Sequence, residues 1–475
     1  MKKSALFLAL SLALVSNGIT ACSDSDNNNE NNNNDNPKQE CEDVNGCGSQ
    51  GQGSEDPQNP GQEAQGKLEL NTIKSTLQRE KPVVADEAMK SFVAGQYDLN
   101  FELIRTAEEQ LKKDNAMIST FSIQTALAMT YAGANGDTAA EMKSALHFDD
   151  SVHKELNKID AIIKAKNKEA IDREDYKLDA VEVKTSNNLY YAAKSYQWAD
   201  EWLDALALNY DAGITEINFG ADPEGARKYI NDIVSKDTHN RINDLIPKDG
   251  ITALTRAVIT NSIYFKAPWA SMDIFKASDK LVFHKLENGD VNVDYLIDSA
   301  HYAYMEAENY QAVSVPLREG DFEVLFVLPS DGKFIDVQNS LDGSLIGNIF
   351  DSFSYEAQVN LKMPCYTFET SLSLSEPFKM LGMNKAFGDS ADFSKMTTSP
   401  NDLYISEIYH KSFVALNEDG IEAAAATAVI ADENAIDMPE KIVDLTLDRP
   451  YFFVIYESET KSPLFVGRVM DPSAK

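Results

Sequence analysis

The chain has 475 residues, and 43 lysine and arginine residues stand against 76 aspartate and glutamate residues, which gives a formal net charge of −33 at pH 7. This acidic balance argues against nucleic-acid binding, because proteins of that class need a basic surface to neutralise phosphates. The length is sufficient for a large hydrophobic core, and on its own it would correspond to about three domains of ~150 residues each.

The first residues have the pattern of a secretory signal. Two lysines precede an apolar run at residues 5–15, which is too short to span a membrane as a mature helix. This pattern predicts a signal peptide over residues 1–21. Ile19-Thr-Ala-Cys22 resembles the lipobox of bacterial lipoproteins, and the acidic run after it is similar to export signals of Bacteroidota surface lipoproteins. The resemblance implies acylation of Cys22 and an outer-membrane protein, with surface exposure expected over a periplasmic location.

Residues 22–67 form a distinct acidic segment that is rich in asparagine, glutamine and glycine. They contain almost no aromatic or branched apolar side chains, so burial could not offset the entropy of ordering them. We expect a flexible tether. Cys41 and Cys47 lie within it and could pair in an oxidising envelope, but their spacing matches no zinc pattern.

Residues 68–475 form the folded part, with regular hydrophobic periodicity from about residue 88. Apolar spacing predicts helices over residues 101–111 and 223–234, the second with Pro223 in its first turn. Strands are predicted over residues 183–191, 257–269, 325–329, 408–416 and 442–447. The segment 257–269 is largely apolar, so we expect that strand to be buried on both faces.

A run of small residues, Glu418-Asp-Gly-Ile-Glu-Ala-Ala-Ala-Ala-Thr-Ala428, lies between the last two of these strands. Four consecutive alanines favour a helix, although the run is short for a helix that stands alone in water. In an extended conformation one face would be small and uncharged, and it would carry Ile421, Ala423, Ala425, Thr427 and Val429. Such a strand could enter an existing sheet without burying a charge, with Gly420 as the pivot.

This run resembles the reactive-loop hinge of inhibitory serpins, and the resemblance extends over most of the body, from about residue 88 to residue 471. Residues 115–142 are similar to the amino-terminal signature of that family. Residues 257–269 match its Asn…Tyr-Phe-Lys…Trp motif, and residues 449–469 match its terminal strands. The resemblance implies an α+β fold in one large domain, with three β-sheets, about nine helices and an exposed reactive-centre loop.

The resemblance also assigns roles to individual residues. The implied hinge consists of Glu418, Gly420, Ile421, Glu422, Ala423, Ala424, Ala425, Ala426, Thr427 and Ala428. Ile421 departs from the family, which usually has threonine there. The implied sheet-opening positions are Ser119, Ser122, Asn261, Trp269 and His410, with His410 expected to bond to Asn261. The family spacing places the cleaved bond at Asn434–Ala435, with Met438 as a less favoured position.

The implied function is inhibition of serine proteases by a suicide-substrate mechanism. A protease cleaves the loop and forms an acyl-enzyme, and loop insertion into the central sheet then traps it. Small apolar residues near the bond favour elastase-like enzymes or chymotrypsin- and subtilisin-like enzymes. The absence of arginine and lysine there disfavours trypsin-like ones. The expected partners are host or competitor serine proteases, and the membrane through Cys22.

We expect a monomer without a cofactor, a bound metal or catalytic residues of its own, because the six histidines fit no metal or triad motif. Two other functions remain open at this point. One is a non-inhibitory binding module with the same fold on the cell surface. The other is a nutrient-capturing surface lipoprotein, although the sequence offers no evident aromatic platform for a glycan.

Overall fold

The apolar segments assemble into a central sheet whose middle strands are buried on both faces. The computed structural model describes residues 68–84, 86–172, 177–193, 196–271, 274–277, 279–287, 289–398, 402–421 and 441–474. Several sequence predictions lie outside these residues: the signal peptide 1–21, the tether 22–67 with Cys22, Cys41 and Cys47, the hinge residues Glu422 to Ala428, and Asn434, Ala435 and Met438.

The central sheet has seven strands in the order β1 (Leu70–Ile73), β6 (Ile214–Ile217), β5 (Glu182–Ala192), β7 (Ala257–Pro268), β18 (Gly420–Ile421), β17 (Glu407–Asn417) and β16 (Tyr366–Ser373). All residues of β7 except Lys266 are buried, which confirms the prediction from its apolar sequence. In β16, at one edge, buried and exposed residues alternate, as in a strand with one face toward water.

Two further large sheets complete the β structure. One has six strands in the order β12 (Ala303–Glu306), β13 (Tyr310–Leu317), β14 (Phe322–Pro329), β20 (Tyr451–Glu457), β21 (Pro463–Val469) and β2 (Ala116–Ile118). The other has four strands in the order β19 (Lys441–Thr446), β15 (Ala357–Pro364), β11 (Tyr295–Ala300) and β8 (Phe275–Lys276). Two short ribbons pair β9 (Leu281–His284) with β10 (Asp290–Val293), and β3 (Ile171–Asp172) with β4 (Lys177–Leu178).

The described residues contain ten α-helices, where the sequence predicted about nine. They are α1 (Asp86–Thr106), α2 (Glu108–Leu111), α3 (Thr120–Tyr131), α4 (Gly136–Ala145), α5 (Val152–Ala165), α6 (Asp200–Tyr210), α7 (Pro223–Asp237), α8 (Phe334–Ser340), α9 (Gly343–Asp351) and α10 (Ser375–Met380). In α7 the Asp222 carboxylate accepts a hydrogen bond from the Gly225 amide at 2.8 Å, which caps the helix ahead of Pro223.

The first predicted helix was placed too late in the chain. The structure has a 21-residue helix from Asp86 and a separate short helix that ends at Leu111. Acidic Asp86 and Glu87 occupy the first turn of α1 and Arg105 the last, an arrangement that complements the helix dipole.

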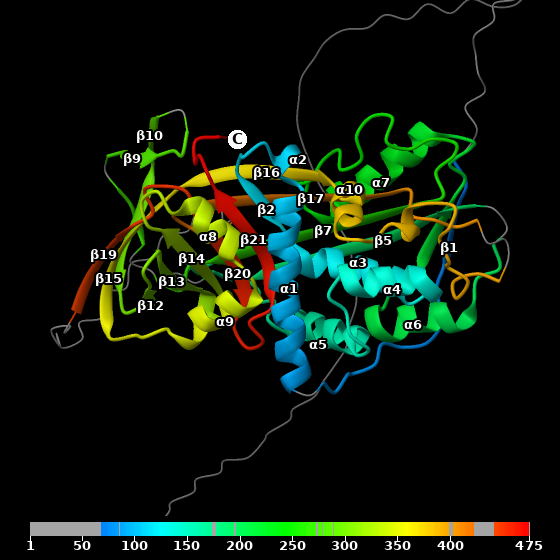
Figure 1. The fold of residues 1–475 in the computed structure, drawn as a ribbon, viewed down its shortest axis with the longest axis horizontal. Coiled ribbons are helices and arrows are strands. Elements are labelled where there is room, and N and C mark those ends of the chain that lie inside the picture. The colour runs from blue at the N-terminus through cyan, green and yellow to red at the C-terminus, as the bar shows by residue number, and fades with distance from the viewer. Residues whose placement is uncertain are drawn as a thin grey trace, which may run out of the picture. The chain divides into compact units, whose positions relative to one another are not determined.

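α3 lies at the centre of the body. It packs against β5 and β7 of the central sheet and against β21 of the six-stranded sheet, and its residues from Thr120 to Thr130 are all buried. On the other face of the central sheet, α7 covers a second, smaller apolar cluster that includes Ile230 and Val234. Figure 1 shows α6 toward one end of the body, and β12, β15 and β19 at the other.

The segment before α1 contains a strand that was not predicted from the sequence. β1 pairs with β6 in antiparallel register and extends the edge of the central sheet. Beyond it, the Lys74 ammonium pairs with Asp211 at 2.5 Å, and the Arg79 guanidinium pairs with Asp160 at 2.5 Å. Residues 68–84 therefore fasten the sheet edge to α5 and to the end of α6.

Candidate functional site

The central sheet forks between β7 and β17. At one end these strands pair directly and in parallel, with Asn261 opposite His410. At the other end the two residues of β18 lie between them, and Ile421 stands opposite both Ala267 of β7 and Leu416 of β17. The sheet thus has a place for an additional strand, and the chain that leads to the undescribed segment already occupies its entrance.

Glycine is the only residue type that fits at position 420, where the chain turns into this entrance. Its φ is +138°, a conformation that residues with a side chain rarely adopt. A Cβ atom there would lie 2.3 Å from the carbonyl oxygen of Ala267 and 2.6 Å from the Cα of Pro268. The glycine therefore allows the backbone of β18 to approach β7 closely enough to pair with it.

Ile421 faces the interior. Its exposed fraction is 3%, and its partners across the sheet, Ala267 and Leu416, are 0% and 1% exposed. Apolar neighbours therefore accommodate the isoleucine side chain, which is larger than the threonine usual in the family, at the entrance. The preceding turn is polar: Glu418 is exposed, and the Asp419 amide donates to the Asn417 side chain at 3.0 Å.

Trp269 fixes the position of this turn. Its indole Nε1–H donates to the carbonyl oxygen of Asn417 at 2.9 Å, while the ring is buried. Trp269 itself follows directly after β7, so the bond joins the end of one strand at the fork to the end of the other. An indole has one donor and a large apolar surface, which suits such a partly polar contact.

Charges near the fork were not predicted from the sequence. Lys266 of β7 pairs with Asp179 at 2.9 Å, and the buried guanidinium of Arg318 donates to the carbonyl oxygens of Asp179 and Glu169. Burial raises the pKa of the Asp419 carboxyl, and the nearby charges of Glu418 and Asp179 raise it further. The turn therefore carries excess negative charge close to one lysine.

The closed end of the fork contains a buried polar cluster. His410 Nδ1 lies 2.6 Å from Asn261 Oδ1, and the Ser119 backbone amide donates to His410 Nε2 at 3.2 Å. All three residues have exposed fractions of 0%. Because Nε2 accepts a hydrogen bond, Nδ1 carries the proton and the ring is neutral. Burial lowers the pKa of His410 to about 3, in agreement with this geometry.

Neighbouring bonds tie the cluster to other strands. Ser122 of α3 donates to the Asn187 side chain on β5 at 3.0 Å. Ser412 of β17 donates to the carbonyl oxygen of Met117 at 2.6 Å. Of the predicted sheet-opening residues, Ser119, Ser122, Asn261 and His410 therefore gather at the closed end. Trp269 lies at the open end. Asn187 was missed, because nothing local distinguishes it from other polar strand residues.

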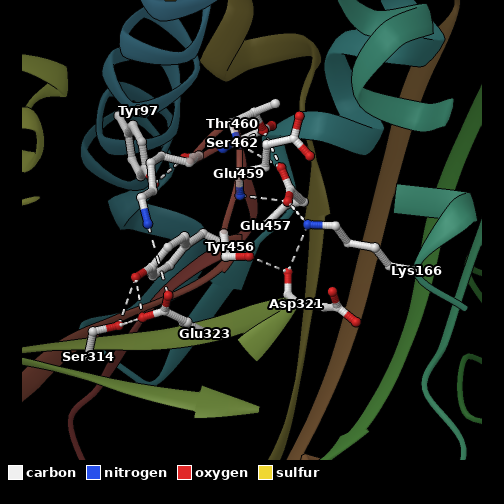
Figure 2. Close-up of polar contacts among 12 residues, drawn as sticks. Tyr97, Lys166, Ser314, Asp321, Glu323, Tyr456, Glu457, Glu459, Thr460 and Ser462 are labelled. Carbon is white, nitrogen blue, oxygen red and sulfur yellow. Dashed lines mark hydrogen bonds and ion pairs between the residues drawn. The ribbon is translucent and has the colours of Figure 1, made fainter. Parts of the chain in front are cut away.

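A second buried network holds the carboxyl-terminal strands (Figure 2). The Glu457 carboxylate accepts hydrogen bonds from the amides of Glu459 and Thr460, at 2.7 and 2.8 Å, and it forms an ion pair with Lys166, which follows α5. Tyr97 of α1 donates to the carbonyl oxygen of Lys461 at 2.8 Å. These contacts fasten the turn between β20 and β21 to α1 and α5.

Within the described ranges, no group of three or more His, Cys, Asp or Glu side chains could hold a metal ion. No helix of the part that the structure describes is long and apolar enough to cross a membrane.

Comparison with known proteins assigns the chain to a family. The family profile described as Serpin (serine protease inhibitor) matches residues 94–472. The chain belongs to the serpin family. This confirms the prediction of an α+β serpin fold. Members of the family are generally protease inhibitors and not enzymes.

Several relatives are similar to this serpin over most of their length. An uncharacterised serpin-like protein of Thermococcus kodakarensis is 35% identical, covering 83% of this chain and 87% of the relative. The leukocyte elastase inhibitor of Bos taurus is 32% identical, covering 78% and 97%. The human leukocyte elastase inhibitor is 30% identical, again covering 78% and 97%.

Solved structures share the fold at lower identity. The crystal structure of a thermophilic serpin, tengpin, in the native state gives a TM-score of 0.72 at 24% identity, covering 85% of this chain and 99% of that one. Thyroxine-binding globulin in complex with thyroxine gives 0.66 at 23% identity, covering 82% and 100%.

Acidification is expected to destabilise this serpin through His410. A free histidine has a pKa of about 6.5, whereas folded His410 has a pKa of about 3. The stability that the neutral ring contributes is complete above pH 6.5 and is lost progressively as the pH falls toward 3. Partly buried His153, whose pKa is lowered to about 4 by desolvation, acts in the same direction.

Chemical unfolding of wild-type, H410Q and H153Q at pH 7, 5.5 and 4 measures this dependence. Each variant should lose less free energy of unfolding between pH 7 and pH 4 than the wild type, by on the order of 3 kcal/mol for H410Q. An H410Q variant with the full wild-type pH dependence would contradict a neutral, buried His410.

Replacement of Gly420 by alanine should dislodge β18 from the fork. The strained backbone and the close approach to Ala267 predict a loss of about 1–3 kcal/mol in the free energy of unfolding. Hydrogen exchange of the Ile421 amide should accelerate at the same time. Gly347→Ala in α9 is the matched control, because a Cβ there meets no atom within 4 Å and alanine favours a helix. Equal behaviour of the two variants would contradict the assigned role of Gly420.

Proposed function

We propose that this serpin inhibits serine proteases by acting as a suicide substrate whose cleaved loop inserts between β7 and β17. The observation that carries the proposal is the fork, with β18 already paired on both sides at its open end. A strand that continued from Ile421 would find unused strand edges on both neighbours as far as the closed end.

The register of β18 determines which residues would meet. Ile421 lies opposite Ala267 and Leu416, so each further residue moves back by one position along both β7 and β17. Thr427 would then stand between Asn261 and His410, the pair that closes the fork. Complete insertion therefore requires the bond between His410 and Asn261 to break.

The same register explains the small residues. Inward-facing Ala423 would lie between buried Phe265 and Val414, and Ala425 between Ile263 and Ser412, where a large side chain has no space. Outward-facing Glu422 would lie opposite Lys266, which is a favourable cross-strand pair. Each new backbone hydrogen bond contributes about 1 kcal/mol net, so an inserted strand gains several.

The chemistry belongs to the protease. Its serine attacks the carbonyl carbon of the residue before the cleaved bond, predicted to be Asn434, and the amine of Ala435 leaves. Insertion then competes with hydrolysis of the acyl-enzyme ester. Each ~1.4 kcal/mol on the insertion barrier changes the ratio of trapped to released protease about tenfold.

The loop sequence and the relatives support one target class. The residues near the predicted bond include Val429-Ile-Ala431 and Ala435-Ile436, which suit the small apolar pockets of elastase-like enzymes. Relatives that cover 78% of this chain are named leukocyte elastase inhibitors. Chymotrypsin- and subtilisin-like enzymes are the second choice, through Met438. Glu433 or Asp437 would instead suit a protease that cleaves after acidic residues.

The alternative function is a non-inhibitory binding module. Bulky Ile421 at the first inserted position is the feature that favours it. Thyroxine-binding globulin, which has the same fold, is a neighbour whose structure contains thyroxine. The alanine-rich hinge favours inhibition, since a binding module has no need for uncharged, small side chains along one face.

A gel assay with one hinge variant tests the proposal. The full chain is mixed with leukocyte elastase, chymotrypsin or subtilisin, and a complex stable in SDS is expected with at least one of them. Ala425→Arg would place a cation between Ile263 and Ser412, which costs several kcal/mol unless it is paired, so this variant should be cleaved without forming the complex.

Ala424→Arg is the matched control, because it would face outward between Tyr264, which is 8% exposed, and the partly exposed Phe413, and it should retain more of the complex than Ala425→Arg. Complexes at wild-type yield from Ala425→Arg would refute insertion. Cleavage of the wild type without any complex would favour the binding module. The mass of the released carboxyl-terminal peptide identifies the cleaved bond.

We further propose that the protein is a lipoprotein of the bacterial cell envelope, anchored through Cys22 with the body outside the outer membrane. The signal pattern of residues 1–21 and the lipobox-like Ile19–Cys22 support this. Cys22→Ala should abolish the incorporation of labelled palmitate and shift the protein from the membrane to the soluble fraction. Protease accessibility in intact cells then distinguishes an outward from a periplasmic location. If Cys22→Ala incorporated no palmitate but remained in the membrane fraction, anchoring through Cys22 would be contradicted.

A further inference from the structure

A cavity opens where the chain returns to the body after the undescribed segment 422–440. It has a volume of about 770 Å³. Its lining comes from three places in the sequence: Tyr304 and Glu306 of β12, Ser354 and Glu356 just before β15, and Lys441 at the start of β19. β15 and β19 are parallel neighbours with Ala357 opposite Lys441, so Glu356 stands beside the point where the loop ends.

The cavity combines one restrained cation with two carboxylates, and the Tyr304 hydroxyl donates to the Glu306 carboxylate at 3.4 Å. The Lys441 ammonium lies 5.6 Å from the centre of the Tyr304 ring, in a cation–π contact that holds it against one wall. Glu306 and Glu356 are both exposed, and neither has an ion-pair partner among the residues that the structure describes. Exposed Glu308 and Asp351 lie within two residues of the cavity lining in sequence and add negative charge.

Large apolar side chains are also exposed beside these carboxylates. Tyr355, adjacent to Glu356, is 65% exposed, and Ile442, adjacent to Lys441, is 62% exposed. Exposed aromatic groups next to charged residues are typical of protein interfaces, where tyrosine contributes contact area at a low cost in entropy. A small anionic or metal ligand would not need these two side chains.

We propose that this surface is a secondary binding site for the target protease, which receives a basic side chain from the rim of the protease active site. The inference rests on the proposed inhibitory function. Five residues lie between Ala435 and Lys441, so the two positions are at most about 22 Å apart along an extended chain. A protease bound at the predicted bond therefore reaches this surface with the side of its cleft that binds residues after the bond.

The charge of the site determines how it acts. Carboxylates at the edge of an interface mainly change the rate of association, and their effect decreases with ionic strength. Glu306 and Glu356 should therefore accelerate the encounter with proteases that are basic at this rim. The ratio of trapped to released protease depends on insertion and should not change.

The test compares two pairs of substitutions in the full chain. Glu306→Gln with Glu356→Gln removes both carboxylate charges at constant size. Glu201→Gln with Asp232→Asn removes two exposed carboxylates from α6 and α7, which Figure 1 places at the other end of the body. Association rates with leukocyte elastase, chymotrypsin and subtilisin are measured at 0.05 and 0.5 M salt, together with the number of inhibitor molecules consumed per protease.

We expect the first pair to slow association about three- to tenfold at low salt with the most basic protease, and to have little effect at high salt. The control pair should change the rate less than twofold, and inhibitor consumption should remain that of the wild type. Equal rates for the two pairs would overturn the secondary site and leave inhibition intact. No SDS-stable complex with any protease would overturn the proposed function itself, and this inference with it.

Discussion

The bond between His410 and Asn261 is the contact on which the rest of the fork depends. It joins β17 to β7 at the last of the four residue pairs through which the two strands pair directly, next to the fork, and both residues are buried. A neutral imidazole suits this place, because it donates to one neighbour and accepts from the Ser119 amide without bringing a charge into the interior. The cluster is strong enough to close the sheet, yet it consists of a few replaceable hydrogen bonds.

Around this contact the body is fastened at its periphery. Residues 68–84 tie the sheet edge to α5 and α6. The Lys166–Glu457 pair ties the hairpin of β20 and β21 to the end of α5. Removal of one partner from such a buried pair would leave an uncompensated charge, which makes these ties costly to break. The strands on either side of the fork therefore belong to well-anchored blocks, and the fork is the place where they part.

The strands of the fork were the easiest elements to predict from the sequence. Residues 257–269 and 408–416 have apolar patterns that hardly fit another conformation, and they became β7 and β17. The short α2 and the early start of α1 were missed, because mixed polar sequence gives weak periodicity. β1 was missed because its residues are mostly exposed, so only its pairing with β6 defines it as a strand. Contacts between distant residues, such as Lys166 with Glu457, leave no local signal.

The presence of β18 in the fork has a kinetic consequence. The first residues of a strand are the most difficult to add, because they lose conformational freedom before they gain a full set of hydrogen bonds. In this chain Gly420 and Ile421 have already made that transition, so a strand growing from them would begin in the propagation phase. Its progress would then be limited where it meets the contact between His410 and Asn261. The register places that point six residues beyond Ile421, at Thr427. The time available before ester hydrolysis would thus be spent mainly on one step, the parting of His410 from Asn261.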